Sequence, residues 1–363
     1  MRALLPLLLC SCGLAAQAVE RADVSRPGQL RITFDPTITI WDREYTPAGR
    51  VPIGASLPAT VFVHAEQRIT PLTAELGLTD RVSLQLFLPL VRAMVRARLP
   101  LDSGGPGSAL DSLLADTTYG FAPVGNTLTR LRYFAGDVAI AAKLRLAGRG
   151  GEGAAGAGGT PYAATLALVL RLPTGHLASP NDLFAISSGD HQTDLEGRLT
   201  QELTVAGHLW LNLSLRAARQ LPGTRARRVG PENVLLLPRA TLARLAWAPG
   251  DYAAVDFAPL LRLDRSFGAG PTLSYFTKRR DHYTFISPQD STALAARLGA
   301  PRSASVLDAG TSQRFLRLGW AMSYLGPGLE AGMSVEQTVS GAGGRVPATT
   351  VFRLVLRTWR KLF

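Results

Sequence analysis

Cysteine is nearly absent from this chain. Cys10 and Cys12 are the two cysteines among its 363 residues. Both fall within residues 1–18, which are typical of a secretory signal peptide, because Arg2 precedes an apolar run and Ala16-Gln17-Ala18 fits a small-x-small cleavage site. Cleavage would leave a mature chain without thiols, which excludes disulfides and cysteine-ligated metal sites. Lipid attachment at Cys12 is the alternative, since the residues around it loosely resemble a lipoprotein-processing site.

Long apolar runs are also lacking. After residue 18, no stretch comes near the roughly eighteen uninterrupted apolar residues that a membrane helix needs. Only helices and closed barrels satisfy the hydrogen bonds of a backbone that lies in hydrocarbon. Any membrane span in this chain must therefore be built from strands.

Acidic residues are fewer than basic ones. The chain has 27 Asp and Glu against 39 Lys and Arg, a formal net charge of +12 at pH 7. A nucleic-acid interface would gather bases and aromatic residues on one compact face. Here the arginines are spread over many segments, so we set nucleic acid aside as a partner. Basic loops suit the anionic lipopolysaccharide of a bacterial outer membrane, and the expected partners are outer-membrane lipid and lipopolysaccharide.

What is present is an alternation of period two that runs from Leu30 to the end of the chain. In segment 162–173, for example, Leu166, Leu168 and Leu170 alternate with mixed residues that end in Arg171. A strand with one apolar face is typical of a membrane-spanning β-barrel. Twelve segments carry the pattern: 30–40, 70–78, 81–98, 134–147, 162–173, 194–205, 208–218, 235–246, 252–264, 312–325, 329–339 and 348–363.

The predicted fold class is therefore all-β: a transmembrane antiparallel up-and-down barrel of about twelve strands, with ten to fourteen as the range. The range is open because 60–66 and 265–287 hold further strand candidates. Short junctions, such as 79–80, 206–207, 248–250 and 326–328, alternate with long ones. This asymmetry predicts one domain over 19–363, with short periplasmic turns, both termini in the periplasm, and long extracellular loops that include 99–133 and 265–311.

Charged residues should lie on the inner face of the barrel, because an arginine that faces lipid at the midplane costs about 2–4 kcal/mol. In segment 81–98 we expect a bulge at Pro89 to move the apolar set to the other face. Acidic residues accompany the bases at Glu196, Glu202, Asp256, Glu330 and Glu336. The candidate lumen-lining residues are Arg92, Arg96, Lys143, Arg145, Arg171, Arg198, Arg216, Arg262, Arg317 and Arg353.

Two interpretations of such a lumen remain open. Rings of basic side chains select anions in some pores, so the arginines could favour an anionic solute. Alternatively, bases and acids could satisfy one another across a small barrel that side chains fill.

Residues for chemistry are scarce. The five histidines are scattered, and no pair has metal-ligand spacing. Asp190-His191 beside Ser187-Ser188 is the nearest approach to a hydrolase site, but these residues are ordinary turn formers next to Gly189. We expect no enzyme activity, no catalytic residue, no metal and no cofactor.

Two groups of residues resemble a known family. One is Gly136-Asp137-Val138 leading into Ala141-Ala142-Lys143-Leu144-Arg145, followed after a glycine-rich turn by Leu170-Arg171-Leu172-Pro173-Thr174-Gly175. The other is Glu75-Leu76-Gly77-Leu78-Thr79-Asp80-Arg81 with Leu88-Pro89-Leu90. Together, over roughly 70–220, they resemble outer-membrane transporter proteins named for the meta-pathway degradation of phenol. The resemblance implies an outer-membrane barrel that passes small, often aromatic or hydrophobic, compounds.

The end of the chain departs from the usual ending of an outer-membrane protein. Phe363 is the expected terminal aromatic residue, but Arg357 and Lys361 occupy its parity. Either the last strand kinks near Thr358, or the barrel-assembly machinery, an expected partner, recognises this ending less strongly. The leading hypothesis is a monomeric outer-membrane channel or transporter for uptake or efflux of a small organic solute. The alternatives are a structural or adhesion barrel with a plugged lumen, and an outer-membrane hydrolase with a rim site.

Overall fold

The computed structural model describes residues 20–55, 62–98, 116–121, 127–148, 162–182, 187–230, 236–264 and 266–362. The proposed signal peptide, with Cys10 and Cys12, lies outside these residues. So do most of loop 99–133 and the terminal Phe363.

The described chain forms a closed antiparallel barrel of twelve strands, which confirms the predicted fold class and strand number. The first strand position is shared by two collinear strands, β1 and β2, and the fourth by β7 and β8. Both β1 and β2 pair with β5 on one side and with β20, the last strand, on the other, which closes the wall. The wall strands are β1 (Gln29–Phe34), β2 (Thr37–Trp41), β5 (Phe62–Gly77), β6 (Val82–Arg98), β7 (Thr127–Ala135), β8 (Ala139–Ala147), β9 (Tyr162–Arg171), β10 (Asp194–Val205), β11 (Leu209–Gln220), β14 (Tyr252–Arg262), β15 (Phe267–Lys278), β17 (Thr311–Gly326), β18 (Leu329–Gly344) and β20 (Thr350–Lys361).

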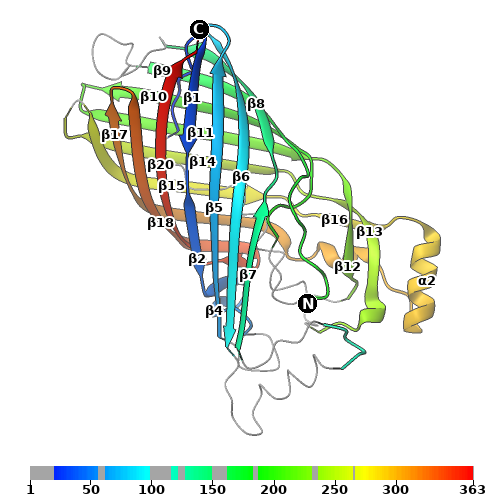
Figure 1. Cartoon of the computed structure of the whole chain (residues 1–363). Coiled ribbons are helices and arrows are strands. Elements are labelled where there is room, and N and C mark those ends of the chain that lie inside the picture. The colour runs from blue at the N-terminus through cyan, green and yellow to red at the C-terminus, as the bar shows by residue number, and fades with distance from the viewer. Residues whose placement is uncertain are drawn as a thin grey trace.

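Tight turns gather at one end of the barrel. Residues 78–81, 206–208, 263–266 and 327–328 connect strand pairs there, and the C-terminus lies at the same end (Figure 1). We call this the turn end and the opposite end, which carries the longer connections, the loop end. At the loop end β5, β6 and β7 project beyond their neighbours, since β5 and β6 stay paired as far as Phe62 and Arg98 (Figure 1).

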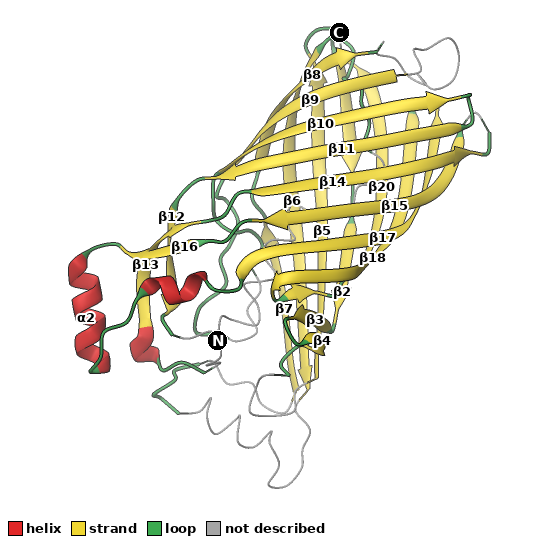
Figure 2. Cartoon of the chain, turned by 180° about the vertical axis from the view of Figure 1, so that it is seen from behind, coloured by secondary structure: helices red, strands yellow, loops and turns green. Residues whose placement is uncertain are grey.

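A small subdomain stands beside the loop end (Figure 2). It contains the sheet of β12 (Gly223–Arg228), β13 (Leu242–Ala248) and β16 (His282–Phe285), the helix α2 (Pro288–Leu298), and the 3-10 turns η2 (Arg239–Thr241) and η3 (Ala304–Asp308). Leu245, Trp247, Tyr283, Leu294 and Leu307 pack as its core. A second small sheet joins β3 (Arg43–Thr46), β4 (Gly49–Pro52) and β19 (Val346–Pro347).

One predicted wall strand was wrong. Of segment 235–246, residues 242–246 belong to β13 in the subdomain, and 267–278 takes the segment's place in the wall as β15. Alternation shows only that one face of a strand is buried, and the buried face of β13 covers the core of the subdomain. Glycine and proline obscure the same pattern in β15, at Gly268, Gly270 and Pro271.

This exchange corrects two connections. The turn 248–250 lies at the loop end instead of the turn end, and β14 is followed after a short connection by β15, from Arg262 to Phe267. The long connection predicted at 265–311 therefore shrinks to 279–310, because its first part is wall strand β15. Residues 62–66, taken as part of a further candidate pair, begin the single long strand β5.

The outer wall carries an apolar belt. Large apolar side chains point outward on successive strands, and among them are Leu84, Leu86, Leu88, Leu90, Leu166, Leu168, Leu170, Trp320, Met333, Phe352 and Leu354. Their inward neighbours on the same strands are buried or half-buried. An apolar band on the outside of a closed barrel is typical of a membrane-spanning barrel. No helix in the described residues is long and apolar enough to cross a membrane.

Candidate functional site: the barrel lumen

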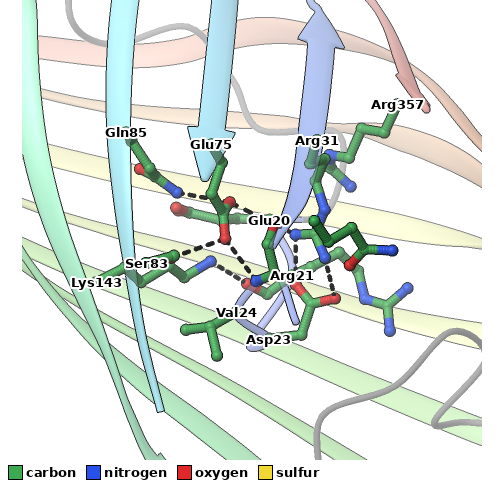
Figure 3. A network of polar contacts seen from close by, with 12 residues as sticks. Glu20, Arg21, Asp23, Val24, Arg31, Glu75, Ser83, Gln85, Lys143 and Arg357 are labelled. Atoms are coloured by element: carbon green, nitrogen blue, oxygen red, sulfur yellow. Dashed lines mark hydrogen bonds and ion pairs between the residues drawn. The ribbon is translucent and has the colours of Figure 1, made fainter. Parts of the chain in front are cut away.

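The segment before β1 lies inside the barrel. Arg21, Ala22, Val24 and Ser25 are at most 3% exposed. Figure 3 shows the segment surrounded by inward side chains of the wall, including Glu75, Ser83 and Lys143. We call residues Glu20–Ser25 the luminal segment. Because it reaches β1 at the turn end, it occupies the lumen from that side.

Ion pairs hold the luminal segment across the full width of the lumen. Nε of Arg21 lies 2.9 Å from Glu202 of β10, and its Nη1 lies 2.6 Å from Glu330 of β18. Asp23 accepts two hydrogen bonds, of 2.9 and 2.8 Å, from the guanidinium group of Arg31. This parallel arrangement gives both strength and a fixed orientation.

Further hydrogen bonds fix the segment's backbone and its first side chain. Lys143 donates to the carbonyl of Arg21 at 2.9 Å, and Asn212 donates to the carbonyl of Glu20 at 2.6 Å. The carboxylate of Glu20 lies 3.1 Å from Nη1 of Arg198 and accepts a bond of 3.3 Å from Ser214. The amide of Ser25 donates to Glu75 at 2.8 Å. The segment is therefore bound by its main chain as well as by its charges.

Beside the luminal segment, the lumen contains a cavity of about 210 Å³ with two unlike walls. Glu20 and Arg21 of the segment form part of its lining. An apolar wall comes from β5, β6 and β9 with Ile69, Pro71, Phe87, Pro89, Val91 and Val169. Basic residues come from the end of β9 and from β10, β11, β15 and β20, with Arg171, Arg198, Arg216, Lys278 and Arg353. Such a chamber can accommodate an apolar body and a negatively charged group at the same time.

The bases of the charged wall are paired with acids. Arg171 lies 2.9 Å from Asp194, Arg216 lies 2.7 Å from Asp256, and Arg198 lies 2.7 Å from Glu196. Arg353 binds Asp35 through two nitrogens. In this state the charges satisfy one another, which is the second of the two interpretations drawn from the sequence.

Eight of the ten predicted lumen-lining residues have inward parity on wall strands. They are Lys143, Arg145, Arg171, Arg198, Arg216, Arg262, Arg317 and Arg353. The cavity lining includes five of them and leaves out Arg145, Arg262 and Arg317. The predicted acids Glu196, Glu202, Asp256, Glu330 and Glu336 are buried on the same inner face.

Arg92 and Arg96 were predicted wrongly, because they point outward. The inward residues of this part of β6 are Val91, Ala93, Val95 and Ala97, so the parity continues through Pro89 without a flip. Pro89 stands directly opposite Pro71 of β5 in an unbroken register. The irregularities lie in the flanking strands instead. Wall position one breaks at residues 35–36, where Asp35 donates to the Pro71 carbonyl, and position four breaks at 136–138, where Gly136 donates to the Pro89 carbonyl.

The proposed rim hydrolase residues have structural partners. Ser188 is 1% exposed, and its hydroxyl donates to the carbonyl of Ala135 at 2.7 Å while it accepts from the amide of His176 at 2.8 Å. Nδ1 of His191 lies 3.2 Å from the carbonyl of Gly175. These contacts tie the 172–193 connection to the break in the fourth wall position, as expected for turn-forming residues. In the described residues, no group of three His, Cys, Asp or Glu side chains could hold a metal.

Sequence reasoning missed the residues that occupy the lumen. Glu20, Arg21 and Asp23 precede the first alternating segment, so no strand parity applied to them. Arg31 and Asp35 lie in or beside β1 and were not singled out, although Arg31 has the parity of an inward residue. A signal was present: charges of both signs stand directly between the signal peptide and the first strand, where a short periplasmic end needs none.

Comparisons with known proteins agree with this architecture. No family model and no curated protein matches the chain. Among solved structures, the chain is similar to an outer membrane channel from Pseudomonas putida F1, with a TM-score of 0.58 at 11% identity over 93% of this chain and 98% of that one. Weaker likenesses are to the transport unit of the autotransporter AIDA-I from Escherichia coli (TM-score 0.41, 8% identity, 98% and 97% covered) and to a Pseudomonas aeruginosa FadL homologue (TM-score 0.34, 8% identity, 97% and 97% covered). The first of these likenesses places the fold in the class of outer-membrane β-barrels.

Proposed function

We propose that this protein is an outer-membrane channel or transporter for a small organic solute. The observation that carries the proposal is the cavity inside the barrel, lined on one side by apolar and on the other by basic residues. A barrel that served only as a scaffold would have no need of a two-sided chamber at its centre. The outer-membrane location follows from the apolar belt and from the signal peptide proposed for residues 1–18.

The chamber favours an aromatic or aliphatic carboxylate as the solute. Ile69, Phe87 and Val169 offer an apolar surface to a ring or chain, while Arg198 and Arg216 stand on the charged side. Arginine is suited to carboxylates because its planar donors match both oxygens. This substrate class is consistent with the resemblance to the phenol-degradation transporters, and membership of that family remains a proposal.

The luminal segment would keep conduction low until it moves. Arg198 and Arg31 now bind Glu20 and Asp23, so a solute carboxylate and the segment would compete for the same guanidinium groups. A plugged structural barrel is the second candidate, and it is favoured by the same segment. The two differ in whether displacement of the segment opens a path.

Planar-bilayer recording tests the channel. The purified protein, recorded with sodium benzoate and with sodium chloride on one side, should show small, infrequent openings and a reversal potential that reports anion flux. Substitution of Glu20 and Asp23 together, by Gln and Asn, should increase the open time. A barrel that shows no conductance in either form would support the plugged scaffold and overturn the channel.

Conductance does not test the hydrolase alternative. Hydrolysis that survives Ser188→Ala and His191→Ala would remove its one named site.

Monomeric assembly and recognition by the barrel-assembly machinery are also proposals. The structure offers one relevant fact: β20 pairs with β1 in continuous register from Leu356 to Lys361, so the wall shows no kink at Thr358. The inward parity of Arg357 thus continues to Lys361. We expect a weaker assembly signal than that of an outer-membrane protein with apolar residues in place of Arg357 and Lys361.

A further inference from the structure

Arg92 and Arg96, which were predicted to face the lumen, belong to a cluster that faces outward. On β6, the outward row reads Leu84, Leu86, Leu88 and Leu90, and then changes to Arg92, Met94 and Arg96. On β5, the outward row changes from Leu72 through Thr70 to Arg68. Leu72 stands opposite Leu88, and Arg68 stands opposite Arg92, so both strands change from apolar to basic at the same level. We call Arg68, Arg92 and Arg96 the outer arginine cluster.

The cluster lies at the edge of the apolar belt that is nearer the loop end. The turn end of β6 begins at Val82, beside the exposed Asp80 and Arg81, and ten residues separate Val82 from Arg92. At about 3.4 Å per residue and a tilt of about 40°, this distance rises about 26 Å along the barrel axis. The apolar band of an outer-membrane barrel is about 25 Å tall. Arg68 and Arg92 are therefore level with the head groups of the leaflet at the loop end.

Among the described residues, the ion pairs of the cluster do not balance its charge. Like charges directly opposite each other on one face of a sheet are destabilising, and Arg68 and Arg92 form such a pair. Glu66 lies between them, with Oε1 at 2.5 Å from Nε of Arg68 and at 3.6 Å from Nη1 of Arg92. One carboxylate thus lies between two guanidinium groups, and Arg96 adds a third positive charge two outward positions beyond Arg92, after Met94.

An aromatic ring completes the surface. Tyr133 of β7 stands opposite Arg92 and is 69% exposed, and the Arg92 guanidinium carbon lies 6.0 Å from the centre of its ring. This contact places the Arg92 guanidinium group beside the exposed ring of Tyr133 on the outer face. Tyrosine is common at this level of membrane barrels because its ring is apolar and its hydroxyl is wet.

We propose that the outer arginine cluster binds the phosphate groups of lipid A, the membrane anchor of lipopolysaccharide. The apolar rows below would contact the acyl chains, and the arginines would meet the phosphates where the chains end. Arginine forms paired, charge-assisted hydrogen bonds with phosphate. The proposal rests on the outer-membrane location in the proposed function and is independent of any solute that passes through the lumen.

Native mass spectrometry of the folded full chain in detergent tests this site, with bisphosphorylated lipid A and the same lipid without phosphates as probes. The triple substitution Arg68→Gln, Arg92→Gln and Arg96→Gln should weaken lipid A binding at least about tenfold. Arg314→Gln is the matched control, because Arg314 also points outward near the loop end but stands opposite Thr277 and Ala342 instead of a second arginine. It should change binding by less than about twofold.

A gain of affinity gives a second and independent readout. Glu66→Gln removes the carboxylate that competes with phosphate, so this variant should bind lipid A several-fold more tightly. A purely structural role for the cluster would not produce that gain. Heat-modifiable mobility on gels verifies that each variant folds, and Arg92→Gln alone replaces the triple variant if the latter does not.

Three results would overturn the proposal: equal affinity of the triple variant and the unmodified chain, equal binding of the phosphate-free lipid, or full displacement of lipid A by an equimolar amount of inorganic phosphate. The last outcome would indicate a simple anion site. Conductance of the triple variant should equal that of the unmodified protein. A failed channel with intact lipid A binding, or the reverse, therefore separates this inference from the proposed function.

Discussion

Charged residues in the lumen mainly form ion pairs with one another. Arg21 is buried between Glu202 and Glu330, and loss of a buried cation leaves two carboxylates facing each other in a poorly hydrated space. The luminal segment, unlike a residue of a packed core, can move out of the lumen. Water then enters the lumen and hydrates the two carboxylates.

Arg21→Gln should therefore release the luminal segment without unfolding the barrel. We expect higher single-channel conductance and cleavage of residues 20–28 by added proteinase K, while heat-modifiable mobility on gels stays unchanged. Arg26→Gln removes an exposed arginine from the same stretch and should leave the conductance as it was. An unchanged conductance in Arg21→Gln would show that this ion pair does not hold the segment.

A glycine also determines where the segment can pass. A Cβ added to Gly77 would lie 1.9 Å from the carbonyl oxygen of Arg26 and 2.4 Å from that of Ser25. Both are backbone atoms and cannot rotate away.

Gly77→Ala should displace the end of the luminal segment at a cost of about 1–3 kcal/mol, typical of overpacking. Trypsin cleavage after Arg21 should become faster. Gly197→Ala, in β10, is the control because its Cβ would meet nothing nearer than 4.0 Å. Equal cleavage rates in the two variants would contradict the close approach at Gly77.

At the scale of elements, strand parity was the most reliable information in the sequence. It placed Lys143, Arg216 and Glu336 on the inner face correctly, because alternation is strict wherever a strand keeps its register. It failed at Arg92, where the proline suggested a bulge. The pairing partner decides that question, and the sequence does not show that Pro71 and Pro89 would lie opposite each other with breaks in the strands beyond.

The alternation of a strand does not show which sheet the strand joins. Leu245 and Trp247 alternate in β13 as regularly as wall residues do, yet they cover α2 and η3 of the subdomain. The helix itself was partly predictable, since Gly299 ends it in a left-handed conformation with φ of 67°. It starts after Ser287, which is the N-cap, with Asp290 completing a capping box.

Ser287→Ala should loosen this helix. Loss of the cap costs about 1 kcal/mol, which falls on the subdomain and not on the barrel. Hydrogen exchange of the α2 amides should become roughly fivefold faster, while exchange in the wall strands stays the same. Ser291→Ala, within the same helix, should have a smaller effect. If exchange throughout the barrel also accelerated, the subdomain would not be a separate stability unit.

At the scale of the whole molecule, the luminal segment changes the charge of the pore. It brings two carboxylates, Glu20 and Asp23, and one guanidinium group, Arg21, into a space that the wall lines with bases and acids in near balance. The barrel and its strand number could be predicted because twelve repeats of one pattern reinforce each other. The content of the lumen could not, because it depends on contacts between residues far apart in the chain.

Removal of both carboxylates, by Glu20→Gln with Asp23→Asn, should shift the pore toward anions. Arg198 and Arg31 would then face the conduction path with fewer acidic partners. In a potassium chloride gradient the reversal potential should move in the direction of chloride permeability. Asp80→Asn, an exposed turn residue, is the control. A shift toward cations would mean that the arginines do not line the path.

The span of the Arg21 contacts sets an order of events in folding. Glu202 and Glu330 lie 181 and 309 residues from Arg21 along the chain. The two carboxylates come within reach of one side chain only once β10 and β18 have taken their places in a nearly complete wall. Contacts that distant form late, because the loop-closure entropy must be met first. The luminal segment, although it is synthesised before the strands, is therefore the last part to reach its final position. A probe of refolding placed on the luminal segment should respond later than a probe placed on the strands.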